Sequence, residues 1–246
     1  MRAFRVFDVI GGALGLLPRF GPGIYADYLA AGIVVSTLGA LFAPEDLRNA
    51  LTGTVGDDWI WTRILANPMF YVSGAVHAAV TAAAFARVYT TLEPQTGADI
   101  AATFRAGLLP LCGLSILVDL AFNLAFLVFF LAAVLIAALT SFLVPAVVVE
   151  NAGWQGLARA ATLARGHLLR LVGIWLAILV PWVVLLIWND PRDPSLADAS
   201  VTTLWLTDIL SGIFAPLFSA FSLLCVLVAY RSLHHDQDRR LEDTFR

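Results

Sequence analysis

The chain has 246 residues, of which 60% are hydrophobic and 13% are charged, and its formal net charge is -3. Soluble domains are about 45–50% apolar and about 25% charged, so this composition excludes an ordinary soluble fold, which could not bury so much apolar surface. The slightly acidic balance also excludes a strongly basic nucleic-acid-binding protein.

Residues 1–20 are predicted to form an amphipathic helix in the cytoplasmic interface of the membrane. Their apolar side chains recur at steps of three and four, which gives the helix one apolar face. Arg5 and Arg19 are then placed to reach lipid headgroups. The segment Gly21-Pro22-Gly23 follows, and we expect it to break the helix before the chain enters the membrane.

Six apolar runs are long enough to cross the ~30 Å hydrocarbon core of a bilayer as helices. The longest apolar stretch, residues 106–149, holds Asp119 as its one formal charge. One helix of that length would be about twice as long as the core is thick, so a helical hairpin is predicted, with the position of its turn left open. The predicted spans are 23–43, 64–89, 106–128, 131–149, 167–188 and 201–230, followed by a cytoplasmic tail over 231–246.

The expected fold is therefore all-α: one polytopic membrane domain over residues 1–246, with six transmembrane helices and additional interfacial helices. All 15 basic residues are Arg, and twelve of them fall in the segments on one side of this arrangement. The positive-inside rule makes that side the cytoplasm, so both termini are expected there. The absence of Lys, with abundant Ala, Leu and Val, favours a bacterial protein, and hence the bacterial inner membrane.

Two further cytoplasmic segments are predicted to form short helices on the membrane surface. The first begins near Asp99, which can cap it. In the second, Trp154, Leu157, Ala161 and Ala164 form an apolar stripe. One interpretation is a collar that binds lipid headgroups, and the other is that these helices only connect spans. The arginines expected to contact headgroups are Arg5, Arg19, Arg159, Arg165 and Arg170.

Residues 142–150 (FLVPAVVVE) and 156–170 (GLARAATLARGHLLR) carry a family resemblance. They resemble the bacterial membrane-domain family named after glycerophosphoryl diester phosphodiesterases, which includes uncharacterised membrane proteins of the YciC type. In that family a span ends in a proline, a β-branched run and a glutamate, and an arginine-bearing helix then leads to the turn that opens the next span. The resemblance implies six spans but no phosphodiesterase activity, because that activity belongs to a separate soluble module. The matching residues are Pro145, Glu150, Arg159, Leu163, Arg165, Gly166 and His167.

Five polar side chains inside the predicted spans are candidates for an intramembrane site. Counting along the helices places Asp119 and Asp208 at similar depths, with Asn123 one turn from Asp119. Asp27 and His77 fall in the inner half, so two polar layers are predicted. These layers either line a cavity for a polar headgroup, a proton or a small solute, or they form hydrogen bonds that only fix helix packing.

The sequence contains no paired-histidine zinc motif, Cys-x-x-Cys pair, nucleophile elbow or phosphate-binding glycine loop. We therefore expect no enzyme activity, no cofactor and no metal site. The predicted function is that of a non-catalytic inner-membrane protein that interacts with lipids or supports envelope homeostasis. The alternatives are an accessory subunit of a larger membrane complex, and a transporter of a small solute or lipid that uses intramembrane carboxylates. Membrane lipids are the expected partners, with a homo-oligomer or a larger complex as further options and no nucleic acid.

Overall fold

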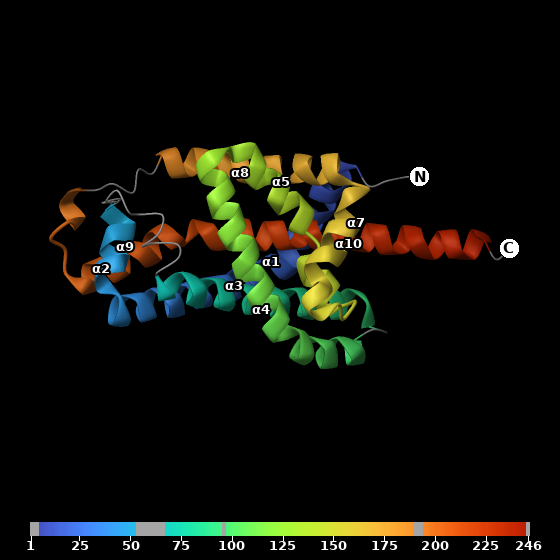
Figure 1. Cartoon of the computed structure of the whole chain (residues 1–246), viewed down its shortest axis with the longest axis horizontal. Coiled ribbons are helices and arrows are strands. Elements are labelled where there is room, and N and C mark those ends of the chain that lie inside the picture. Colours follow the sequence, from blue (N-terminus) through green and yellow to red (C-terminus); the bar gives the residue numbers. More distant parts are fainter. Residues whose placement is uncertain (1–4, 53–66, 95–96, 189–193, 245–246) are drawn as a thin grey trace.

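The computed structural model describes residues 5–52, 67–94, 97–188 and 194–244, which form helices joined by short turns and contain no β-strand (Figure 1). The predicted all-α class is confirmed. The α-helices are α1 (Val6–Phe42), α2 (Pro44–Thr52), α3 (Pro68–Leu92), α4 (Gly97–Val128), α5 (Phe130–Thr140), α6 (Leu143–Val148), α7 (Gly156–Arg165), α8 (Leu168–Trp188), α9 (Val201–Gly212) and α10 (Phe214–Thr244). Short 3-10 turns, η3 (Gly153–Gln155) and η4 (Pro194–Leu196), precede α7 and α9.

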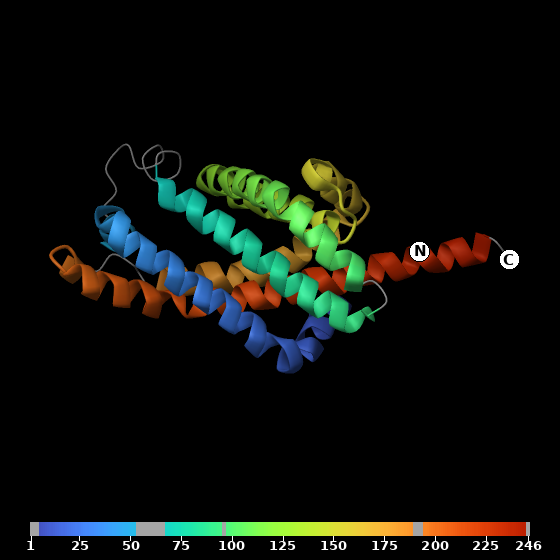
Figure 2. The same cartoon turned by 90° about the horizontal axis from the view of Figure 1, so that it is seen from below.

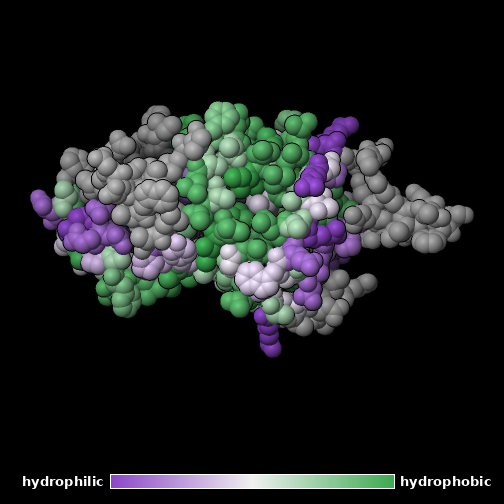
Figure 3. Space-filling view, in the orientation of Figure 1, coloured by the Kyte–Doolittle hydropathy of each residue, from purple (hydrophilic) through white to green (hydrophobic). Residues whose placement is uncertain are grey.

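Several helical segments are long and apolar enough to cross a membrane. Among the described residues there are 5 such segments, or 6 if the bent pair Gly153–Arg165 and Leu168–Pro181 forms one span. Figure 3 shows hydrophobic side chains across the middle of the face in view, with hydrophilic side chains gathered on either side of them. These features are compatible with a multi-pass membrane protein. The segments are Val6–Phe42, Pro68–Leu92, Thr103–Phe126, Phe130–Val148 and Val201–His234.

Helix α1 does not contain the predicted interruption before the first span. The backbone remains helical from Val6 to Phe42 even though Pro18 and Pro22 lie inside this segment. Each proline removes one backbone donor and bends a helix without having to end it. Figure 2 shows that bend in the darkest blue part of α1, near its beginning. The prediction that residues 21–23 break the helix is therefore wrong, because proline and glycine here change the direction of the helix rather than terminate it.

The apolar stretch 106–149 forms the predicted hairpin, and its turn lies at Phe129 between α4 and α5. The residues at the start of α4 are not a separate surface helix, because α4 is continuous from Gly97 and contains Pro110. Asp99 is consequently the third residue of α4 rather than its cap. The second arm of the hairpin bends at Ser141 and Phe142, where α5 gives way to α6.

The last apolar run, 201–230, is divided at Ile213 into α9 and α10. Pro216 follows within the first turn of α10, where a missing backbone N–H is tolerated. The Tyr25 hydroxyl of α1 donates a hydrogen bond to the Ile213 carbonyl at 3.2 Å, so α1 supplies a partner at this break. Helix α10 then continues to Thr244, so the described part of the predicted tail 231–246 is helical (Figure 2).

Helix α3 lies at the centre of the bundle and packs against α1, α4, α6 and α10. Its buried face includes Ala78 and Ala82, two residues of the small-residue pattern that lets helices approach closely. Helix α4 packs mainly on α3 and α5, whereas α8 packs mainly on α5. This arrangement leaves space between α3, α4, α8 and α10, and that space holds the candidate site.

Candidate functional site

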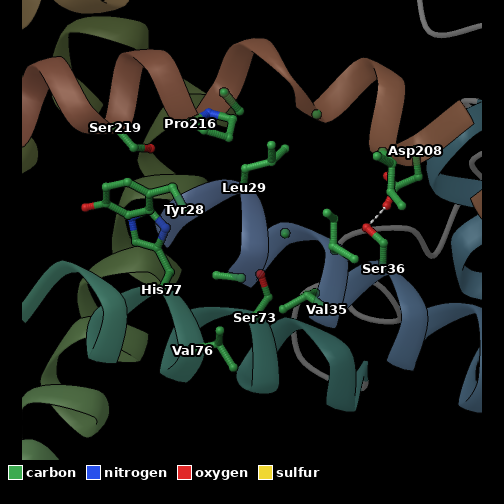
Figure 4. Close-up of a pocket in the computed structure, with 16 residues that line it drawn as sticks. Tyr28, Leu29, Val35, Ser36, Ser73, Val76, His77, Asp208, Pro216 and Ser219 are labelled. Atoms are coloured by element: carbon green, nitrogen blue, oxygen red, sulfur yellow. Dashed lines mark hydrogen bonds between the residues drawn. The ribbon is translucent and has the colours of Figure 1, made fainter. Parts of the chain in front are cut away.

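Three neighbouring cavities inside the bundle share one residue, His77 of α3. We name each after a residue that lines it alone. The Asp208 cavity has a volume of about 360 Å³ and lies between α1, α3, α9 and α10 (Figure 4). The Thr81 cavity of about 280 Å³ and the Asn123 cavity of about 550 Å³ both reach α4 and α8. Volumes of this order are close to the ~300–1,000 Å³ typical of small-molecule sites.

Asp208 of α9 has a protein partner inside its cavity. The Ser36 hydroxyl of α1 donates a hydrogen bond to Oδ2 of Asp208, as the dashed line in Figure 4 marks. At the next residue of α1, Thr37 accepts a hydrogen bond from the Trp205 indole at 3.0 Å. These two bonds join α1 to α9. For Asp208, this favours the interpretation in which the polar side chains of the predicted spans fix helix packing.

His77 and Tyr28 lie where the cavities meet. The Tyr28 ring lies 5.1 Å from the His77 ring, centroid to centroid, and Figure 4 shows the two side chains next to each other. The Thr81 hydroxyl donates its one proton to the His77 carbonyl at 2.7 Å. Thr81 must then accept the 2.7 Å hydrogen bond that it shares with the Tyr28 hydroxyl. This chain of bonds fixes the Tyr28 ring against α3.

Asp119 of α4 differs from Asp208 because its carboxylate has no hydrogen-bond or ion-pair partner among the described residues. The nearby amide of Asn123 donates to the Asp119 backbone carbonyl at 2.7 Å rather than to the carboxylate. The carboxylate instead lines the Thr81 and Asn123 cavities together with His77. Asp119 thus presents an open acceptor to a cavity inside the bundle.

The remaining walls around Asp119 are rich in aromatic rings. Phe122 and Trp175 line both the Thr81 and the Asn123 cavities, and Tyr28 and Phe85 complete the Thr81 cavity. The Trp175 indole donates a hydrogen bond of 2.7 Å to the Ser141 hydroxyl, which itself donates to a backbone carbonyl of α5 at 2.8 Å. These bonds hold the Trp175 ring in place at the bend between α5 and α6.

The cavities do not follow the two polar layers that the sequence suggests. Asp27, expected beside His77, forms an ion pair with Arg87 of α3 at 2.6 Å and lines none of the three cavities. Asp119 shares two cavities with His77 but none with Asp208. Counting residues gives the depth of a side chain along its helix, but the direction of each side chain around its helix decides which residues meet.

The arginines predicted to contact lipid lie near the ends of helices or at their bends. Arg5 precedes α1, and the Arg19 guanidinium lies 4.9 Å from the centroid of the Phe20 ring. Arg165 ends α7 with its side chain exposed, and Arg170 approaches the His167 ring at 3.4 Å. Contact with lipid remains a prediction for these four and for Arg159, which forms an ion pair of 2.5 Å with Glu150.

The segment that carries the family resemblance forms a compact joint between the hairpin and α7. Glu150 accepts hydrogen bonds from Arg159 of α7 and, at 3.2 Å, from the Tyr230 hydroxyl of α10. Pairing with Glu150 also raises the pKa of the Arg159 guanidinium. Pro145 is buried, and the chain turns by 100° around Gly166 and His167 between the segments Gly153–Arg165 and Leu168–Pro181.

Helix α7 buries one of its faces against the rest of the protein. Gly156, Ala160 and Ala164 are buried at steps of four, while Trp154 is 62% exposed. The predicted apolar stripe shares Ala164 with this buried face and otherwise lies beside it, so contact of the stripe with the membrane stays a prediction. A Cβ on Gly156 would lie 2.4 Å from Cγ2 of Val147, so the absence of a side chain at Gly156 is what lets α7 contact α6.

The described residues contain no cluster of three or more His, Cys, Asp or Glu side chains that could hold a metal ion. No family model matches the chain, and neither a curated protein nor a solved structure is similar to it. The cavities are therefore the features of the molecule that point to a function. Sequence reasoning missed Tyr28, Phe122 and Trp175. Phe122 follows Asp119 by three residues on α4, a spacing that could have linked the two. Tyr28 and Trp175 come from other helices, and no spacing links them to Asp119.

Proposed function

We propose that this chain is a non-catalytic membrane protein that binds a membrane lipid in the Thr81 and Asn123 cavities. The observation that carries the proposal is the carboxylate of Asp119, which faces an apolar-walled space inside the bundle without a partner among the described residues. Most other walls of these cavities are aromatic or aliphatic. A space with a few polar groups in an apolar wall suits an amphipathic molecule.

The surface helix α7 supports the same function. It lies at a steep angle to α8 and exposes Arg159 and Arg165. A helix that follows the membrane interface with arginines on its exposed side attracts anionic headgroups. The proposal includes membership of the family that the sequence resembles, and the joint around Glu150 supports it. It also includes a location in the bacterial inner membrane with both termini in the cytoplasm, which the uneven distribution of arginines supports.

Transport of a lipid or small solute is the second candidate. It is favoured by the fact that all three cavities meet at His77, so a ligand in one cavity is next to the other two. Transport requires the ligand to leave on the side opposite to its entry, whereas lipid binding requires only one of the cavities to be occupied. Both candidates place the ligand beside Asp119.

The test is extraction of the full chain into native lipid discs without detergent, followed by mass spectrometry under non-denaturing conditions. We expect one lipid class to remain bound at fixed stoichiometry after the surrounding bilayer lipid has been removed. A second protein retained at fixed stoichiometry, with no lipid, would contradict the proposal and indicate an accessory subunit. Movement of the bound lipid between the leaflets of proteoliposomes would favour transport over binding alone.

A further inference from the structure

We infer that the site beside Asp119 selects an organic ammonium group. This inference rests on the proposed lipid-binding function and specifies the class of headgroup that the lipid carries. The ligand chemistry is a positively charged amine or quaternary ammonium. Two sources carry it: the headgroup of an ethanolamine or choline lipid, and a free amine dissolved in water. The inference depends on three features of the Thr81 and Asn123 cavities.

The first feature is uncompensated negative charge. The described lining residues of the two cavities include Asp119 but no arginine, and their other titratable side chains are those of His77 and Tyr28. Arg87, the arginine of α3, is already paired with Asp27 at 2.6 Å. The Asp119 side chain is partly buried, and an ionised carboxylate that has lost part of its water is stabilised by a cation or by several donors. The described part of the chain supplies neither to Asp119.

The second feature is the aromatic wall. Tyr28, Phe85, Phe122 and Trp175 all line the Thr81 cavity, which Asp119 also lines. Aromatic faces attract cations through their quadrupoles, and enclosures of aromatic rings are the usual sites for ammonium groups in proteins. A wall of this kind gives no advantage to an anionic headgroup, so the combination of rings and carboxylate discriminates by charge sign.

The third feature is that the site is formed before any ligand binds. The hydrogen bond from Trp175 to Ser141 and the bond between Tyr28 and Thr81 hold two of the rings. Rings that are already fixed lose little conformational entropy on binding. The hydroxyls of Thr140 and Ser222 and the ring of His77 line one or both cavities, and they can accept the N–H groups of a primary ammonium.

The experiment uses the full chain in nanodiscs that contain equal amounts of phosphatidylethanolamine, phosphatidylcholine and phosphatidylglycerol. Mass spectrometry after partial delipidation measures which lipid remains bound. We expect the two ammonium lipids to be enriched over phosphatidylglycerol, and the Asp119→Asn variant to lose about tenfold or more of that enrichment. Asp208→Asn is the matched control, because Asp208 lies outside both cavities and is held by Ser36.

A second pair of variants tests the rings. Trp175→Phe keeps an aromatic face, whereas Trp175→Leu removes it, and both lose the hydrogen bond to Ser141. Enrichment should therefore persist in Trp175→Phe and fall in Trp175→Leu. Equal loss in both variants would show that the aromatic face of residue 175 contributes nothing to the selection of ammonium lipids, and would count against the inference. Size-exclusion elution and thermal unfolding of each variant show whether it has folded.

Free amines distinguish the two sources. Choline and ethanolamine are titrated calorimetrically into the protein in discs of pure phosphatidylglycerol. Binding of a free amine that Asp119→Asn abolishes, without enrichment of an ammonium lipid, would support the ammonium site and contradict its lipid function. Retention of lipid regardless of headgroup and of Asp119 would overturn the inference while the lipid-binding function stands. Retention of no lipid and no amine would overturn both.

Discussion

The carboxylate of Asp119 and the imidazole of His77 line the same two cavities from neighbouring helices, and neither side chain forms a hydrogen bond with a described residue. Polar side chains within a membrane bundle normally find a partner, because unsatisfied groups are costly in the absence of water. In the proposed function, a ligand in the space between α3, α4, α8 and α10 supplies the partner that these two side chains lack among the described residues.

The two intramembrane acids are predicted to differ in their contribution to stability. In delipidated protein, Asp119→Asn removes no side-chain hydrogen bond found among the described residues, so the free energy of unfolding should be unchanged or higher. Ser36→Ala removes the donor to Asp208 and should lower the free energy of unfolding by about 1 kcal/mol, the order measured for hydrogen bonds between membrane helices. Unfolding in mixed micelles by titration with denaturing detergent measures both. A large loss of stability in Asp119→Asn would show that this carboxylate is structural.

The ion pair between Glu150 and Arg159 is predicted to hold α7 against the hairpin. Both side chains are partly exposed, so Glu150→Gln should cost only about 0.5–1 kcal/mol locally and raise amide exchange in α7 by about two- to fivefold. Hydrogen–deuterium exchange of the peptide that covers Gly156–Arg165 measures this change. Arg165→Gln is the control, because the exposed Arg165 side chain has no partner among the described residues, and exchange should stay the same. Equal exchange in Glu150→Gln and the native protein would contradict the role of the pair.

Two glycines at opposite ends of α7 are predicted to differ in their tolerance of a side chain. Gly156→Ala would place Cβ 2.4 Å from the buried Val147, and this overpacking should destabilise the protein by about 1–3 kcal/mol. A Cβ on Gly166 would meet no atom within 4 Å, and the backbone there has a φ of -68°, so Gly166→Ala should be tolerated. Thermal unfolding of the two variants side by side provides the comparison. Equal melting temperatures would show that α6 and α7 are not packed as described.

The hairpin is the part of the fold that the sequence predicts most directly. A stretch with one charge in 106–149 is too long for one crossing, and this length argument needs no knowledge of packing. The same reasoning could not detect that α4 begins at Gly97 or that Pro22 bends α1 without ending it. Both outcomes depend on contacts with neighbouring helices, which override local propensity.

The candidate site was predictable in its residue types but not in its grouping. Asp27 and Arg87 lie near the same end of two antiparallel predicted spans. Their ion pair could therefore have been predicted from the depth of each residue along its span. The association of Asp119 with Trp175 was not, because α8 reaches the site only through the 100° turn after α7. A turn of that size cannot be read from periodicity, which reports on one helix at a time.

Photo-crosslinking tests most directly whether a lipid occupies the cavities. A photoreactive phenylalanine analogue is placed at Phe122, which lines both cavities, or at Leu117, which is 52% exposed on the outside of α4. After irradiation in native membranes, position 122 should capture one lipid class in constant ratio to the protein, whereas position 117 should capture a mixture that follows the bulk lipid composition. The same mixture at both positions, or no lipid at position 122, would contradict the proposed site.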